Sequence, residues 1–113
     1  MSTPESAGRD PIIHPIARLS ICGVLAAGAD WVEFSTLRDA ADISDSVLSK
    51  QSRILEDAGY LEVRKGAVGR RPRTWFRLTP SGRQAFHTHV AWLERTVGGL
   101  HRRKERDPSE PRC

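Results

Sequence analysis

The stretch from Phe34 to Thr79 constrains the fold most, because two short helical patterns are followed there by two strand-like runs. The first helix is predicted over Thr36–Ala41. The second is predicted over Asp45–Ala58, because Ser44 can cap its N-terminus and Gly59 can take the left-handed conformation that often ends a helix. Two short helices joined by so short a turn predict a helix–turn–helix unit.

The residues after this unit predict a β-hairpin with a basic loop. Strands are predicted over Tyr60–Lys65 and Thr74–Leu78, the second rich in the Thr, Trp and Phe that strands favour. Residues Gly66–Arg73 contain two glycines and a proline and are predicted to form the loop. A short extended run at Trp31–Phe34 precedes the first of the two helices.

A helix is also predicted on each side of these elements. The N-terminal one starts near Pro15, which suits a first helical turn, and ends near Gly28. Thr79 and Pro80 suit the cap and first position of the C-terminal one, which the Gly98-Gly99 pair is predicted to fray or end. The predicted fold class is therefore mainly α with a small β-hairpin.

Both flanking helices carry more apolar surface than one side of a helix needs. The first is apolar nearly all round, and the last repeats apolar residues at spacings of 4, 3 and 4, as paired helices do. We expect a second copy of the chain to cover them, although packing within one domain explains the same residues. The predicted dimer interface comprises Ile16, Leu19, Gly23, Phe86, Val90, Leu93 and Val97.

The 113 residues fit one domain with a tail at each end. Residues 1–10 and 101–113 are polar and contain proline, so both are predicted to be disordered, which leaves a domain over residues 11–100. Cys22 lies in an apolar pattern and is expected inside the core, and neither it nor Cys113 belongs to a disulfide or zinc pattern, which favours a cytoplasmic location. No apolar run reaches the roughly 18 residues that span a bilayer, so no membrane partner is expected.

Charge is distributed unevenly along the chain. Between Arg64 and Arg77 there are six basic residues and no acidic one, whereas residues 1–45 hold seven acids and three bases. Within the helix Asp45–Ala58, no acid falls between Ser46 and Leu55. A merely solvated helix usually mixes both signs, so this asymmetry predicts a polyanionic partner.

The sequence contains no recognisable enzyme site. No glycine-rich phosphate loop follows a strand, and no nucleophile or metal-ligand motif appears. The histidines are scattered, and His87 and His89, two apart on a helix, are expected to point to different sides. We therefore expect no catalytic residue, no metal and no cofactor.

Two segments carry a more specific pattern, WVEFSTLRDAADISDSVLSKQSRILEDAGYLEVRKG and GRRPRTWFRLTPSGRQAF. The specific features are a helix that ends in Gly-Tyr-Leu, an Arg-Pro-Arg-Thr sequence in the loop, and Leu-Thr-Pro-x-Gly-Arg before the last helix. Over roughly residues 12–97 the chain resembles the winged-helix transcriptional regulators of the MarR and ArsR type, in particular the small group with only a winged-helix domain. It departs from them at Gln51-Ser52, where relatives tend to carry a His-Leu pair.

The resemblance implies a winged helix-turn-helix with the order helix, short strand, helix, helix, strand, wing, strand, helix. It implies that helix Asp45–Ala58 enters a DNA major groove and that the wing Gly66–Arg73 lies over a neighbouring minor groove or the backbone. It also implies a homodimer formed by the first and last helices. A small-molecule effector of unknown identity could bind where two such subunits meet.

The side chains of this helix and wing suit DNA recognition. Gln51 can pair bidentately with adenine, Lys50 can reach guanine or a phosphate, and Val47 can contact a thymine methyl group. The serines are short polar partners for bases or phosphates, and the arginines can reach phosphates or a narrow minor groove. The predicted DNA-binding residues are Ser46, Val47, Ser49, Lys50, Gln51, Arg53, Lys65, Arg70, Arg71 and Arg73.

These patterns predict a sequence-specific regulator, with repression as the expected effect, that acts as a homodimer on a palindromic operator in double-stranded DNA. Two alternatives are left open. One is a winged-helix interaction module whose basic wing binds an acidic protein, and the other is an RNA-binding or nonspecific nucleic-acid-binding protein. A steep salt dependence with preference for one palindrome distinguishes the regulator from both.

Overall fold

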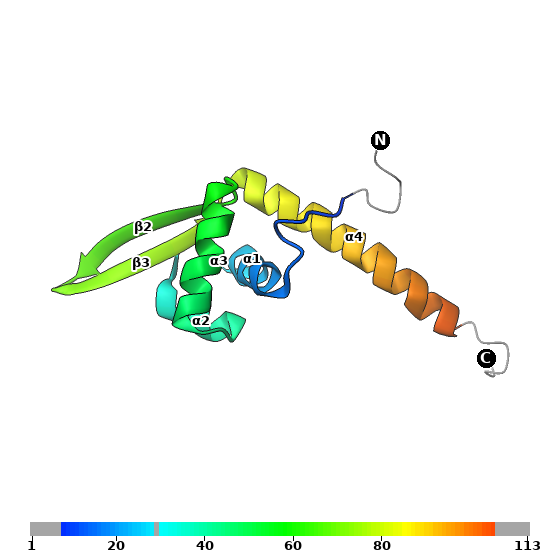
Figure 1. Cartoon of the computed structure of the whole chain (residues 1–113), viewed down its shortest axis with the longest axis horizontal. Helices are drawn as coiled ribbons and strands as arrows, with labels where there is room; N and C mark the ends of the chain where they lie inside the picture. The colour runs from blue at the N-terminus through cyan, green and yellow to red at the C-terminus, as the bar shows by residue number, and fades with distance from the viewer. Residues whose placement is uncertain (1–7, 29, 106–113) are drawn as a thin grey trace.

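The computed structural model describes residues 8–28 and 30–105, without the side chains of residues 99–105. In chain order its elements are α1 (Ile16–Ala27), β1 (Val32–Glu33), α2 (Phe34–Ala41), α3 (Asp45–Asp57), β2 (Leu61–Val68), β3 (Arg71–Leu78) and α4 (Pro80–Glu105). The β2–β3 hairpin and α4 extend in opposite directions from the group formed by α1, α2 and α3 (Figure 1). Four helices and a three-stranded antiparallel sheet of order β1-β3-β2 confirm the winged-helix fold within the described residues.

The core lies around α1, which packs against α2, α3 and α4. Ile21 and Leu25 of α1 are fully buried, and so is Cys22, as expected from its apolar pattern. Burial raises the pKa of the Cys22 thiol to about 12, so this side chain is a small apolar packing group. The other buried apolar residues are Ile13, Leu37, Leu48, Leu55, Leu61, Phe76 and Leu78.

Helix α3 begins and ends where the sequence predicts. The Ser44 hydroxyl accepts a hydrogen bond from the Val47 N–H group at 3.2 Å, and Gly59 follows the helix with a φ of +81°. Leu48, Ser52 and Leu55 are buried, as their spacing predicts. The Ser52 hydroxyl donates to the Ser49 carbonyl group at 3.2 Å, which satisfies this buried polar group.

The hairpin is longer than predicted. β2 and β3 pair as far as Val68 and Arg71, so most of the residues predicted as a loop belong to the ladder, and only Gly69 and Arg70 connect the strands. Gly69 is the first central residue of this turn and has a φ of +64°. A type II′ turn requires a positive φ at that position, which glycine adopts easily. Pro72 was misleading as a loop signal, because β1 pairs only with the other end of β3, and proline is tolerated on such an open strand edge.

Helix α4 is also longer than predicted, because it continues through Gly98 to Glu105. A glycine costs a helix only about 1 kcal/mol relative to alanine, so it weakens a helix without ending it. Residues 101–105, expected in a disordered tail, are therefore helical. The rest of that predicted tail, 106–113 including Cys113, and residues 1–7 of the N-terminal one lie outside the described residues.

The N-terminal segment is tied to α4 around Asp10. Its backbone N–H group donates to Nδ1 of His89 at 2.9 Å, and its carboxylate accepts from the Tyr60 hydroxyl at 2.7 Å. Nε2 of His89 is then the protonated nitrogen, and it faces Nδ1 of His14 at 3.3 Å. The fold thus brings together two histidines that are 75 positions apart in the sequence. Burial and the nearby His14 lower the pKa of His89.

Protonation of His89 should destabilise the fold. Because the folded protein lowers the pKa of His89 below its ordinary value of about 6.5, the unfolded chain binds this proton more tightly. The contribution of His89 to the free energy of unfolding should therefore fall as the pH drops through about 6.5 and should be complete above that value. Urea titrations between about pH 8 and pH 5 measure this effect.

His89→Asn is the informative variant, because it keeps an acceptor for the Asp10 N–H group but does not titrate. It should flatten the pH dependence of stability, whereas His87→Asn, at an exposed position of the same helix, should not. An identical pH dependence in His89→Asn and in the unmodified protein would show that His89 does not cause the loss of stability at low pH.

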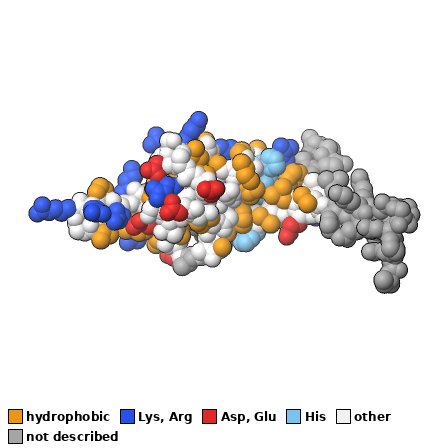
Figure 2. Space-filling model, turned by 90° about the horizontal axis from the view of Figure 1, so that it is seen from below, with side chains coloured by type: hydrophobic (Ala, Val, Ile, Leu, Met, Phe, Trp, Pro, Cys, Tyr) orange, Lys and Arg blue, Asp and Glu red, His pale blue; other side chains and the backbone are white. Residues whose placement is uncertain are grey.

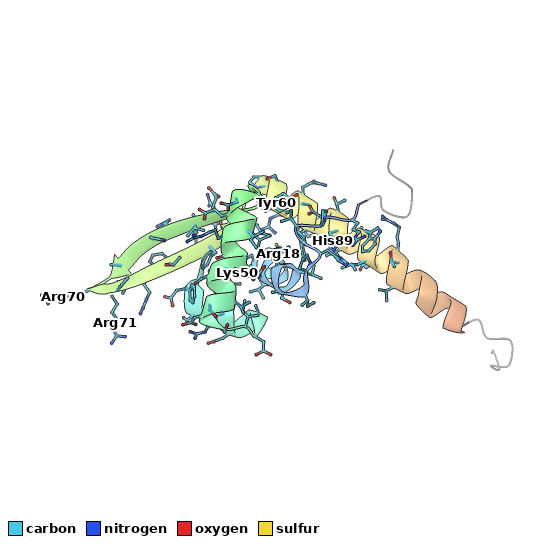
Figure 3. The ribbon with its side chains drawn as sticks, in the orientation of Figure 1. Arg18, Lys50, Tyr60, Arg70, Arg71 and His89 are labelled. Carbon is cyan, nitrogen blue, oxygen red and sulfur yellow. The ribbon has the colours of Figure 1, made fainter. Side chains whose placement is uncertain are left out.

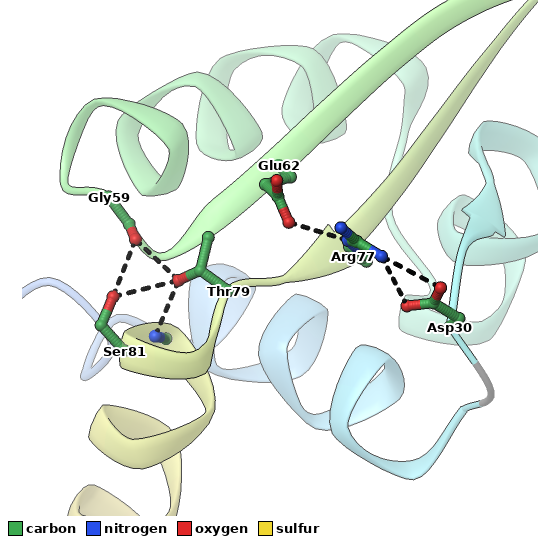
Figure 4. A network of polar contacts seen from close by, with 7 residues as sticks. Asp30, Gly59, Glu62, Arg77, Thr79 and Ser81 are labelled. Carbon is green, nitrogen blue, oxygen red and sulfur yellow. Dashed lines mark hydrogen bonds and ion pairs between the residues drawn. The ribbon is translucent and has the colours of Figure 1, made fainter.

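Hydrogen bonds connect the start of α4 to Gly59, which follows α3. The Thr79 hydroxyl accepts from the Gly82 N–H group at 2.9 Å and donates to the Gly59 carbonyl group at 2.7 Å, and the Ser81 hydroxyl donates to the same carbonyl group (Figure 4). Gly82 packs directly on the backbone of Tyr60. This junction sets where β2 leaves α3, and so where the hairpin lies.

Gly82→Ala should break this junction. The added Cβ atom would overlap the Tyr60 carbonyl oxygen and lie 2.8 Å from its carbonyl carbon, and both are backbone atoms that cannot rotate away. We expect a loss of about 3 kcal/mol in the free energy of unfolding, measured by urea titration. Gln84→Ala, at an exposed position two residues further along the same helix, should change it by less than about 0.5 kcal/mol. Equal stabilities of the two variants would refute the close contact.

Candidate nucleic-acid interface

The outward side of α3 is polar and cationic. Because Leu48, Ser52 and Leu55 are buried, the residues about half a turn away face solvent. Lys50 and Arg53 are exposed there, and Figure 3 marks Lys50 midway along α3. Of the residues predicted on this helix, Ser46, Ser49, Lys50 and Arg53 are exposed, and Val47 and Gln51 are half-buried.

The acid at the start of α3 is paired. Arg38 of α2 forms ion pairs with Asp39 and Asp45, both at 2.9 Å. Hydrogen bonds to the two carboxylates raise the pKa of the Arg38 guanidinium, which stays charged. Arg38 therefore offsets the negative charge that Asp45 places at the N-terminus of α3, next to the exposed serines. Nothing in the sequence marked Arg38 for this position.

Three cations of the hairpin face solvent with neither an ion-pair partner nor a cation–π contact among the described residues: Lys65, Arg70 and Arg71. Arg70 lies in the turn and Arg71 starts β3, so both project from the tip (Figure 3). In the view of Figure 2, Lys and Arg side chains gather toward this end of the molecule, and hydrophobic side chains gather toward α4. The hairpin tip therefore extends positive charge beyond the domain body.

The other cations of the hairpin, Arg64, Arg73 and Arg77, contact acidic or aromatic side chains of the domain. Arg73 pairs with Glu33 at 3.2 Å, and Arg77 pairs with Glu62 at 2.7 Å and with Asp30 at 3.0 Å (Figure 4). Arg77 also lies over the Trp31 ring, 4.5 Å from its centroid, and Arg64 lies 5.3 Å from the same centroid. Arg73, predicted as a wing contact, is thus engaged with the body of the domain.

An open cleft separates α3 from the hairpin. Ser49 and Arg53 lie on its helix side, and Lys65 and Thr74 lie on its hairpin side. Phe34, Val63 and Phe76 also line it, together with Ser52 and Glu56. The fold therefore brings predicted residues of the helix and of the hairpin to one surface, as reading a groove and a flanking backbone together requires.

Gln51 faces the opposite flank of α3. Its carbonyl oxygen accepts a hydrogen bond of 2.6 Å from Nη1 of Arg18, which lies on α1 (Figure 3). Sequence analysis missed Arg18, because the two residues are 33 positions apart and no local pattern relates them. Arg18 is nevertheless the residue that orients a predicted base contact.

Comparison with known proteins agrees with this geometry. A family model described as the winged helix DNA-binding domain matches residues 17–97. The chain belongs to this winged-helix family. An uncharacterized protein of Methanocaldococcus jannaschii is 28% identical to it over 79 residues, which are 70% of this chain and 85% of that protein.

Solved structures of transcriptional regulators are also similar to this chain. A transcriptional regulator homologue from Pyrococcus horikoshii OT3 matches with a TM-score of 0.70 and 26% identity, over 79% of this chain and 87% of that one. A MarR-family transcriptional regulator from Silicibacter pomeroyi matches with a TM-score of 0.57 and 25% identity, over 79% and 61% of the two chains. The chain is therefore a winged-helix DNA-binding regulator, and a MarR-family regulator is among the solved structures to which it is similar.

The winged helix leaves part of its flanking helices uncovered. Ile16 at the start of α1 is 75% exposed and Val97 near the end of α4 is 59% exposed, although both are apolar. Leu19, Gly23, Phe86, Val90 and Leu93 are half-buried within the single chain. Among the described residues, no group of three or more His, Cys, Asp or Glu side chains could hold a metal ion, and no helix is long and apolar enough to cross a membrane.

Proposed function

We propose that this winged helix is a sequence-specific transcriptional repressor that binds double-stranded DNA as a homodimer at a palindromic operator. α3 enters the major groove, and the β2–β3 hairpin grips the adjacent backbone or minor groove. Repression follows from occupancy, because a protein that lies along both grooves excludes other proteins from that DNA. The small-molecule effector site expected between two subunits stays a prediction.

The observation that carries this proposal is the common surface of α3 and the hairpin. Lys50 and Arg53 on the helix and Lys65, Arg70 and Arg71 on the hairpin are exposed cations, and none of them has an ion-pair partner among the described residues. Long-range attraction by such a cluster steers a polyanion toward the helix. Phosphate contacts of the hairpin then supply affinity, and the side chains of α3 supply specificity.

The homodimer is supported by the uncovered apolar residues of α1 and α4. Ile16 of α1 and Val97 of α4 are exposed, and Val90 and Leu93 of α4 are only half-buried. Helix α4 extends away from the domain (Figure 1). Pairing of two such helices along their 4-3-4 seam would bury these side chains. A two-fold dimer would then place two copies of α3 on one side of the duplex.

Selection of random DNA duplexes by the purified protein at a stated salt concentration tests the proposal. We expect the selected fragments to share an inverted repeat with half-sites about one helical turn apart, and the affinity to fall steeply with salt. Val97→Glu, which puts a charge into the proposed seam, should yield monomers in sedimentation and weaken binding to the full repeat. Salt-resistant binding to an acidic protein, with no preferred duplex, would instead establish an interaction module.

The wing contributes through phosphate contacts. Arg70→Ala and Arg71→Ala combined should weaken DNA binding for every sequence, because each subunit loses two exposed cations, and should reduce the slope of log affinity against log salt by about two for each subunit, or about four for the homodimer. Arg73→Ala should change this slope less, since Glu33 already neutralises Arg73. Binding titrations at several salt concentrations measure both effects.

Arg83→Ala is the matched control for loss of charge. Arg83 is exposed but lies at the start of α4 with its guanidinium on the Ala26 carbonyl group, away from the helix–hairpin surface. It should leave the salt slope within about half a unit of that of the unmodified protein. If the Arg70/Arg71 double variant behaves like Arg83→Ala, the hairpin does not contact DNA.

A further inference from the structure

The contact between Arg18 and Gln51 decides which end of the Gln51 amide group faces outward. Nη1 of Arg18 lies 2.6 Å from Oε1 of Gln51, and Nε of the same guanidinium donates to the Ile12 carbonyl group. The guanidinium is therefore held from two sides, by the N-terminal segment and by α3. Arg18 belongs to α1, so the position of its guanidinium does not depend on the side-chain rotamers of α3.

The chemistry of this contact fixes the orientation of the amide. A guanidinium has only hydrogen-bond donors, so the atom of Gln51 that faces Arg18 must be the carbonyl oxygen. Exchange of the amide oxygen and nitrogen would set two donors against each other. The NH₂ group of Gln51 is consequently the part that points away from α1.

The position of Gln51 on the helix lets this NH₂ group reach a base. Gln51 follows the exposed Lys50 and lies between the buried side of α3 and its outward side, where it is half-buried. Ser49, which lines the cleft toward the hairpin, occupies the other flank. A helix inserted in a major groove would therefore present the Gln51 donor on the flank away from the wing.

We propose that Arg18 is a positioning residue that makes Gln51 a hydrogen-bond donor in the major groove, so that Gln51 selects guanine over adenine. Guanine presents two acceptors there, O6 and N7, whereas adenine pairs its N7 acceptor with the N6 amino donor. Bidentate pairing with adenine requires the carbonyl oxygen of Gln51 to accept from the N6 amino group while it also accepts from Arg18, whereas pairing with guanine uses only the NH₂ group and leaves the Arg18 contact as it is. This inference rests on the proposed function and replaces adenine, the base expected from the sequence.

Operator selection with paired variants tests this inference. The base pair read by Gln51 is the one whose preference disappears in Gln51→Ala, and it should carry guanine in the unmodified protein. Gln51→Glu keeps an acceptor for Arg18 but has no donor, so it should lose the guanine preference about tenfold and favour cytosine, whose N4 amino group donates. Arg18→Met frees the amide and should raise the adenine-to-guanine ratio by about tenfold at that position only. Arg83→Met, the same substitution outside the interface, should leave the ratio unchanged.

A measurement on the free protein makes the contact testable without DNA. The side-chain NH₂ signals of Gln51 in a ¹H–¹⁵N correlation spectrum should shift in Arg18→Met and stay in place in Arg83→Met, while the backbone signals show both variants folded. Unshifted Gln51 signals in Arg18→Met, or selection of adenine by the unmodified protein, would overturn this inference and leave the proposed function standing. Absence of any selected sequence would refute the proposed function and the base preference together.

Discussion

Burial of one side of α3 is the constraint on which the rest of this structure depends. Leu48 and Leu55 are fully buried, and complete burial of a leucine contributes roughly 1.5–3 kcal/mol. Each residue turns a helix by about 100°, so fixing these two side chains inward also fixes which residues face outward. Lys50 and Arg53 are therefore exposed as a consequence of core packing, and the polar side of α3 needs no contact of its own to hold it there.

The electrostatics of the surface follow from how its acids are paired. Arg38 is paired with Asp45, Arg73 with Glu33, and Arg77 with both Glu62 and Asp30. Exposed ion pairs of this kind contribute little to stability. Their effect is on the distribution of charge, because Arg38 of α2 and Arg73 and Arg77 of β3 offset these four acids while the cations at the hairpin tip are left to solvent. The resulting surface attracts a polyanion more strongly than the net charge of +4 suggests.

Helix α1 connects the two surfaces proposed for DNA and for the second subunit. Toward α3 it supplies Arg18, which holds Gln51. Toward α4 it supplies Gly23, which lies under the Phe86 ring, and at its start it exposes Ile16. Pairing of subunits through α1 and α4 would thus act on a helix that already contacts α3, the helix proposed to read DNA.

The sequence by itself determined the local elements, the inward side of α3 and the asymmetry of charge. Signals such as the Ser44 cap, Gly59 and the spacing of Leu48 and Leu55 involve residues only a few positions apart, so they can be recognised from the sequence alone. The same local signals misplaced the hairpin loop and the end of α4, because glycine and proline permit a break without requiring one. Only the tertiary structure decided which cations are free, which way the Gln51 amide points and that His14 meets His89. The last two outcomes depend on contacts between residues 33 and 75 positions apart, which exist only once the chain has folded.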